Sequence, residues 1–150
     1  MDHADVMNRC DEKGRHVGLA ALSDVERTEV LVSWFNFEVE CGGFTTFYYN
    51  SAGDNAVATV RALVAVGAKH AAKALRAGNR LYPEGVPPAN RQERFIAKKK
   101  IKAKGCDDPF SKCDDKFAKE DPDVFTKLCN YMDQHAAELR EHISNGKKRR

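Results

Sequence analysis

The sequence predicts an all-α fold, a single compact domain of about six to seven helices. Apolar residues recur at the spacing of helices along most of the chain, and capping residues, glycines and prolines separate these segments. The stretch 43–53 is rich in β-branched and aromatic residues but has no evident partner strand, which favours a short helix there. At 150 residues the chain is the size of one ordinary domain and can bury its own core.

The first third of the chain contains the clearest helix. Residues 1–21 are expected to form an N-terminal extension, either helical or irregular. Ser23 and Glu26 have the spacing of a capping box, in which each side chain accepts a hydrogen bond from the backbone of the other. The helix that they begin should end at Gly42, in a left-handed conformation. Its expected buried face consists of Leu31, Trp34, Phe35, Phe37 and Val39.

Residues 54–90 predict two further helices and a loop. The first has a buried stripe that ends before Gly67 and consists of Val57, Val60, Leu63 and Val64. The second, 68–82, is rich in alanine, a strong helix former, and breaks at Pro83. Prolines and a glycine make 83–90 a loop.

The last third predicts two helices joined by an acidic connector that contains one or two helical turns. Asn90 and Glu93 should cap a helix over 91–104, which ends at Gly105. Asp121 should cap the last helix, with Pro122 in its first turn. The buried stripe of that helix is expected to be Phe125, Leu128, Cys129, Met132, Ala136, Leu139 and Ile143. The helical domain would then span 22–145, followed by a basic tail at 146–150.

Composition excludes several classes of protein. An apolar share of 42% with 31% charged residues is typical of a soluble globular protein. No apolar run approaches the roughly 20 residues that cross a bilayer, and the N-terminus lacks the apolar core of a signal peptide, so we expect a cytoplasmic protein without a membrane partner. The five cysteines form no C-x-x-C pair, which indicates reduced thiols, and we predict neither a metal site nor a cofactor.

Two glycines followed by aromatic residues, Gly42, Gly43 and Phe44, predict a structural corner. Their spacing is not that of a phosphate-binding loop. In the expected corner, Gly42 adopts a positive φ and Gly43 permits close approach of the backbone. Phe44, Phe47 and Tyr48 would then pack in the core.

Residues that could catalyse a reaction are scattered. The five histidines are dispersed, and Glu38 and Glu40 lie on different faces of their helix, so they do not form an acid–base pair. The sequence therefore predicts a protein that is not an enzyme. A small-molecule pocket near Trp34, Tyr48 and Tyr49 is the least supported alternative.

Several ordered blocks of sequence resemble an all-helical bacterial domain of unknown function typified by the DNA-mimic protein of Neisseria. The resemblance spans about residues 22–136 and includes a start at Leu22, Ser23, Glu26 and Arg27. It continues through the corner to a Ser-x-Gly-Asp motif at Ser51, Gly53 and Asp54, and then to a proline loop and a terminal helix. Cys41 and Thr46 replace an asparagine and a glutamine of the family pattern. The resemblance implies an all-α fold, a protein-binding role and a homodimer.

Charge is distributed unevenly and suggests two binding surfaces. Segment 24–54 has six acids against Arg27 alone, a net of −5, whereas segment 91–104 has seven bases against Glu93, a net of +6. We expect a non-catalytic, regulatory protein that binds another protein through an acidic set of residues, Glu26, Glu29, Glu38, Glu40 and Asp54. The alternative is a nucleic-acid-binding protein that uses a basic set of residues, Lys98, Lys99, Lys100, Lys102 and Lys104.

Overall fold

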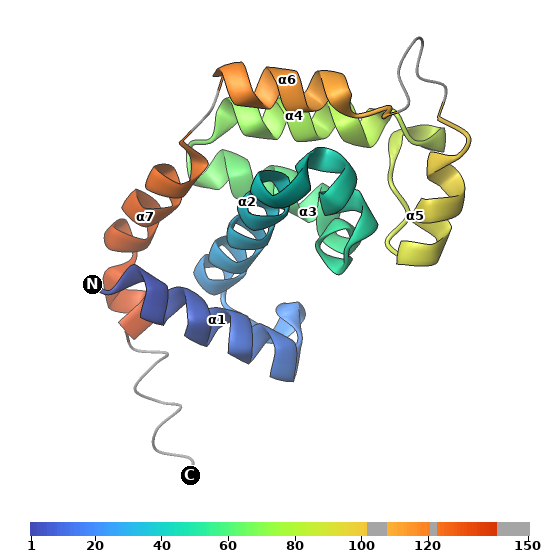
Figure 1. The fold of residues 1–150 in the computed structure, drawn as a ribbon. Coiled ribbons are helices and arrows are strands. Elements are labelled where there is room, and N and C mark those ends of the chain that lie inside the picture. Colours follow the sequence, from blue (N-terminus) through green and yellow to red (C-terminus); the bar gives the residue numbers. More distant parts are fainter. Residues whose placement is uncertain (102–107, 121–122, 141–150) are drawn as a thin grey trace.

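The structure is a computed structural model that describes residues 1–101, 108–120 and 123–140 (Figure 1). In these ranges every regular element is helical, so the predicted all-α class is confirmed. Eight helical segments are present among the described residues, one more than the upper end of the prediction. Seven of them are labelled: α1 His3–Val17, α2 Asp24–Tyr49, α3 Ala56–Ala65, α4 Lys69–Arg80, α5 Arg91–Lys98, α6 Ser111–Glu120 and α7 Val124–Gln134. The eighth covers 136–140, and short 3₁₀ turns lie at η1 Leu19–Ala21, η2 Ser51–Asn55 and η3 Pro83–Gly85.

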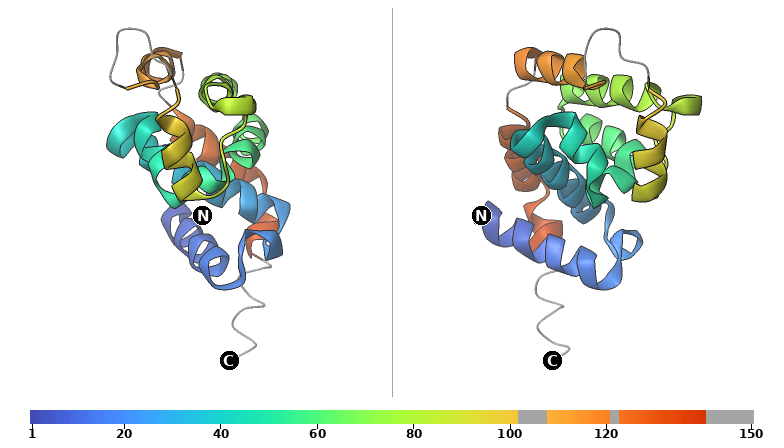
Figure 2. Two further views of the ribbon diagram at one scale, coloured as in Figure 1. Left: turned by 90° about the vertical axis from the view of Figure 1, so that its right-hand side faces the viewer. Right: turned by 45° about the vertical axis from the view of Figure 1, so that its right-hand side comes forward.

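Helix α2 is the centre of the molecule. The helices α1 and α7 lie toward one end of it, whereas α4 and α6 lie side by side toward the other end. All views in Figures 1 and 2 show this arrangement. The N-terminal helix α1 packs against α2 and contributes Val6 and Cys10 to the common core. The predicted capping box is present: Ser23 Oγ accepts from Glu26 N at 3.2 Å, and Glu26 Oε2 accepts from Ser23 N at 2.9 Å.

The corner bends α2, but the two glycines have the reverse of their predicted roles. Gly43 has the positive φ, which is 75°. The φ of Gly42 is −167°, a value that any residue can adopt. A side chain of α6 explains the arrangement, because Asp114 Oδ1 accepts a hydrogen bond from Phe44 N at 2.7 Å and so caps the second half of α2. A Cβ on Gly43 would lie 2.6 Å from that oxygen. The partner is 70 residues away in sequence, so the local pattern could not show which glycine must turn.

Aromatic rings fill the core inside the corner. Phe44, Phe47 and Tyr48 are buried, as predicted. Phe35 packs edge-to-face against Phe44 and Phe47, with ring centroids 5.7 and 5.2 Å apart, the geometry that aromatic pairs prefer.

Arg94 of α5 joins the end of α2 to the loops beside it, a role that the sequence analysis missed. Its side chain is 1% exposed and donates to three backbone oxygens, those of Tyr48 at 2.8 Å, Asn50 at 2.9 Å and Pro88 at 2.9 Å. It also pairs with Asp54 Oδ1 at 2.7 Å. A buried guanidinium is tolerated here because its N–H groups reach acceptors.

Three predicted helices differ in detail. In α3, Val60 and Leu63 are buried, but Val57 and Val64 are each 46% exposed, because the packed face is centred on Leu63. Helix α5 ends at Lys98 and does not continue to 104 within the described residues. Asp123 caps α7, and the predicted cap at Asp121 and Pro122 lies outside the described residues.

The predicted terminal helix is interrupted at His135, which forms a turn before the helix resumes at 136. Leu128, Met132 and Leu139 are buried as predicted, whereas Phe125 is half exposed. Ile143, the end of the predicted 22–145 domain and the tail at 146–150 lie outside the described residues.

Candidate functional site

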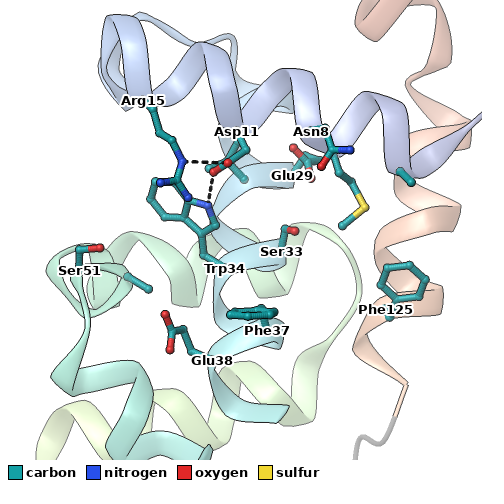
Figure 3. Close-up of a pocket in the computed structure, with 14 residues that line it drawn as sticks. Asn8, Asp11, Arg15, Glu29, Ser33, Trp34, Phe37, Glu38, Ser51 and Phe125 are labelled. Atoms are coloured by element: carbon teal, nitrogen blue, oxygen red, sulfur yellow. Dashed lines mark hydrogen bonds and ion pairs between the residues drawn. The ribbon is translucent and has the colours of Figure 1, made fainter. Parts of the chain in front are cut away.

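An open groove of about 700 Å³ lies between α1, α2, η2 and α7 (Figure 3). The helix α1 forms one wall, α2 forms the floor, and Phe125 of α7 approaches from the far side. In the rest of this description, "the groove" means this surface. It includes Glu38 of the acidic set and Ser51 of the Ser-x-Gly-Asp motif.

Trp34 is held in place at one end of the groove. Its indole Nε1 donates to Asp11 Oδ1 at 2.6 Å, and the other oxygen of Asp11 accepts from Arg15 Nε at 2.9 Å (Figure 3). Because Asp11 and Arg15 are four residues apart on α1, they lie on one face of that helix and reach the same side of α2. The hydrogen bond to Asp11 fixes the orientation of the indole ring, and the ion pair with Asp11 neutralises the charge of Arg15.

Two phenylalanines of the groove remain exposed to solvent. Phe37 of α2 is 64% exposed and Phe125 of α7 is 48% exposed. The sequence analysis placed both in buried stripes, which is wrong. Phe35 occupies the core side of α2, and a residue two positions later points to nearly the opposite side of a helix. Exposed aromatic groups gathered in one concave surface are typical of binding sites.

Glu29 lies at the inner end of the groove, beneath α1. Its side chain is fully buried, and neither carboxyl oxygen has a hydrogen-bond partner within hydrogen-bonding geometry. Burial raises the pKa of Glu29 to about 8, a nearby Cys10 thiol lowers it, and the charges of Asp11 and Glu26 raise it further. Glu29 is therefore protonated and uncharged at neutral pH.

A thiol beside the groove and the metal-binding residue types are candidate sources of chemistry there. Burial raises the pKa of the neighbouring Cys10 thiol to about 12, and the charges of Glu29 and Glu26 contribute smaller increases. The reactive thiolate is therefore not populated at neutral pH. No cluster of three or more His, Cys, Asp or Glu side chains that could hold a metal ion occurs among the described residues. What the groove offers is apolar and aromatic surface beside carboxylates.

The structure separates the members of the acidic set. Glu26 is 3% exposed and pairs with Lys13 Nζ at 2.7 Å, and Glu29 is fully buried. Their predicted role as surface contacts is therefore corrected. Glu26 is buried with its charge satisfied by the capping box and by Lys13, and Glu29 is buried as an uncharged group.

The other three acids are accessible but point in different directions. Glu38 lines the groove and accepts from Asn50 Nδ2 at 2.7 Å. Glu40 is exposed and accepts from Asn36 Nδ2 at 3.0 Å, whereas Asp54 is tied to Arg94 on the side of η2. The structure therefore brings only Glu29 and Glu38 of the acidic set to one site.

The basic set is likewise divided. Lys98 is half-buried, with Nζ 3.4 Å from Thr45 Oγ1, and Lys99 Nζ lies 4.7 Å from the centre of the Phe95 ring. Lys100 is exposed after the end of α5. Lys102 and Lys104 lie outside the described residues. The described lysines do not form one continuous helical face.

The aromatic residues of the third alternative also lie apart. Trp34 lines the groove, but Tyr48 is in the core, where its hydroxyl donates to Asn79 Oδ1 at 2.7 Å. Tyr49 is exposed on another surface, with the Arg91 guanidinium 4.4 Å from its ring centre.

The exposure of Phe37 could have been anticipated from the sequence, because its position on the helix is opposite that of Phe35. The approach of Phe125 to the groove could not, because it depends on how α7 packs.

Comparison with known proteins identifies the family. Residues 20–135 match the model of the DMP19-like protein family. No significant match was found among curated proteins or solved structures. No described helix is long and apolar enough to span a membrane. Since the family model covers well over half of the 150 residues, including the corner and the residues that support it, this chain belongs to the DMP19-like protein family.

Proposed function

We propose that this protein is a non-catalytic regulatory protein that binds another protein through the groove. The observation that carries the proposal is the pair Phe37 and Phe125, two exposed aromatic side chains from different helices that line the same concave surface. Aromatic anchors at the centre of a concave patch supply much of the free energy in many protein interfaces.

The partner that fits the groove has an apolar side chain next to a basic one. The apolar chain would pack between the two phenylalanine rings, and the basic group would face Glu38 and the already paired Asp11. Arg15 is the only cation among the groove residues, and its charge is balanced by Asp11. An amphipathic helix with apolar residues on one face and lysine or arginine at its edge has this character.

The proposal relies on apolar docking rather than on imitation of DNA by carboxylates. A row of exposed acids would be needed to mimic phosphates, and two of the five predicted acids are buried. The homodimer implied by the sequence resemblance is a separate proposal, and light scattering of the purified protein over a range of concentrations would test it.

The deciding experiment compares affinity capture from the native cell lysate by three forms of the protein. These are the wild type, the double variant Phe37→Ser/Phe125→Ser and the control Phe95→Ser, which changes a similarly exposed phenylalanine on α5 outside the groove. All lysates are treated with nuclease, so that proteins held by nucleic acid are removed.

We expect a protein that the wild type and the control capture and the groove variant does not. Its dissociation constant for the purified groove variant should rise by at least tenfold, since each lost aromatic anchor costs about 1–2 kcal/mol or more. Equal capture by all three forms would show that the groove is not the binding site.

A further inference from the structure

Helix α4 has a row of positive charges along its exposed face. Lys69, Lys73, Arg76 and Arg80 are all exposed and follow the spacing i, i+4, i+7, i+11, and are called the α4 stripe below. At 100° per residue the four side chains fall within an arc of roughly 60°, and at 1.5 Å per residue the row is about 16 Å long. The stripe therefore runs nearly parallel to the helix axis.

The charges of the stripe have no described counterions. None of the four residues makes an ion pair or a side-chain hydrogen bond with any other residue that the structure describes, and α4 contains no acid. The chain has five bases and no acid between Asp54 and Glu84, a feature that the sequence analysis did not notice.

The stripe works against the stability of its own helix. Like charges three or four residues apart repel each other along a helix. Lys69 also stands in the first turn, where the helix dipole disfavours a cation, and the N-cap, Ala68, makes no side-chain hydrogen bond. The inward face, by contrast, is built for packing, with Ala71, Ala74 and Leu75 buried. Folding explains the inward face but does not account for four cations on the outward one.

The surroundings of α4 leave the stripe accessible. Helix α6 lies alongside α4, at the end of the molecule away from α1 (Figures 1 and 2). It adds the exposed Lys112 and Lys119, together with the exposed acid Asp115. The groove lies at the other end of α2, so the two surfaces do not overlap.

We propose that the α4 stripe binds the phosphate backbone of a nucleic-acid duplex. A rigid row of about 16 Å covers the axial rise of about five base pairs of a duplex, at 3.4 Å each, and so lies within reach of several phosphates. Single-stranded nucleic acid is a poorer fit, because its binding proteins stack bases on large aromatic rings and α4 has no Phe, Tyr or Trp. Asn79, the one amide side chain on α4, is buried against Tyr48 and Ala56, so α4 has no amide group for reading bases. We assign the four cations to phosphate contacts, which carry no sequence information, and therefore expect no preference for base sequence.

This proposal is independent of protein binding at the groove, and each can fail without the other. It also differs from the alternative based on the basic set, since Lys98 to Lys100 belong to α5 and the turn after it. A matched pair of variants separates the two surfaces: Lys73→Gln/Arg76→Gln removes two charges from the stripe, and Lys99→Gln/Lys100→Gln removes two from the basic set.

The test measures fluorescence anisotropy of a labelled duplex of about 20 base pairs and mixed sequence, over roughly 25–200 mM salt. For the wild type, four phosphate contacts predict that log K falls linearly with log salt, with a slope of about −3.6 or steeper. The stripe variant should lose about 1.8 of that slope and roughly 100-fold in affinity at about 50 mM salt, and the basic-set variant should behave as the wild type. Circular dichroism should show full helix content in both variants.

Three results would overturn the proposal. One is the absence of duplex binding at the lowest salt. Another is an unchanged slope in the stripe variant, or an equal loss in the basic-set variant, which would place the contact elsewhere. The third is equally tight binding of poly-glutamate or of a single strand, which would show that the stripe recognises negative charge without preference for a duplex.

Discussion

Substituting Glu29 by Gln should remove a pH dependence of stability that arises from one buried carboxyl group. Gln has nearly the shape of the protonated side chain but cannot ionise. In the folded protein the pKa of Glu29 is about 8, against an ordinary value of 4.5. Between these values the unfolded chain carries an ionised Glu29, whereas the folded chain holds it protonated.

The direction of the effect follows from this difference in bound protons. Folding takes up a proton in this range, so the free energy of unfolding decreases as pH rises. The contribution of Glu29 is fully present below pH 4.5 and is lost as pH rises through about 8. The slope approaches 1.4 kcal/mol per pH unit, and the whole window corresponds to about 3 to 5 kcal/mol.

The assay is urea unfolding at several pH values between about 5 and 8, followed by the fluorescence of Trp34, the single tryptophan. The quantity of interest is the difference between wild type and Glu29→Gln, because the pH-dependent contributions that the two proteins share cancel in it. Glu12→Gln, at an exposed position on α1, is the control for loss of one acid.

We expect the stability of Glu29→Gln to rise relative to the wild type by at least 2 kcal/mol, as an order of magnitude, between about pH 5 and pH 8. Glu12→Gln should show no such trend. A wild-type minus Glu29→Gln difference that is constant with pH would refute the inference that Glu29 is buried and protonated.

Two further substitutions test the end of α2 and the corner within it. Arg94→Met leaves three backbone oxygens and Asp54 without their donor. The free energy of unfolding, measured by urea titration, should fall by about 3–5 kcal/mol. A loss below about 1 kcal/mol would contradict the buried network. Gly43→Ala strains a positive φ and displaces the Asp114 cap, whereas Gly18→Ala strains a similar φ, 83°, with no atom within 4 Å. Thermal unfolding should show a greater loss for Gly43→Ala by about 1–2 kcal/mol, and equal losses would argue against the cap.

Local sequence signals predicted the local features well. The Ser23–Glu26 capping box, the burial of Phe44 and Phe47 and the helices on both sides of the corner depend on neighbouring residues, so spacing alone reveals them. The Ser-x-Gly-Asp motif was recognised as a pattern, but its physical role appeared only in three dimensions. Gly53 leaves room for Arg94, since a Cβ there would lie 3.0 Å from the arginine Nε, and Asp54 pairs with it.

The candidate site was harder to predict because exposure depends on the partners of each helix. Glu29 was assigned to an acidic surface because it belongs to the acid-rich segment 24–54, and the packing of α1 over it could not be read from that segment. Phe125 was assigned to the core because its helical spacing to Leu128 fits, yet only Leu128 faces inward. The four cations of the α4 stripe were visible in the sequence within a segment that has five bases and no acid, and the alanine content of that segment masked them.

By itself, the sequence determined that the chain forms helices, where most of them begin and end, and that it carries the pattern of an all-helical family. These properties depend on hydrogen bonds and side-chain spacing within one or two helical turns. Tertiary structure alone decided which side of each helix is covered. It buried Glu29 as an uncharged acid, turned Phe37 and Phe125 toward one groove and left the α4 stripe in solvent. The physical reason is that burial and charge state depend on contacts between segments distant in the chain, as Asp114 at the corner illustrates.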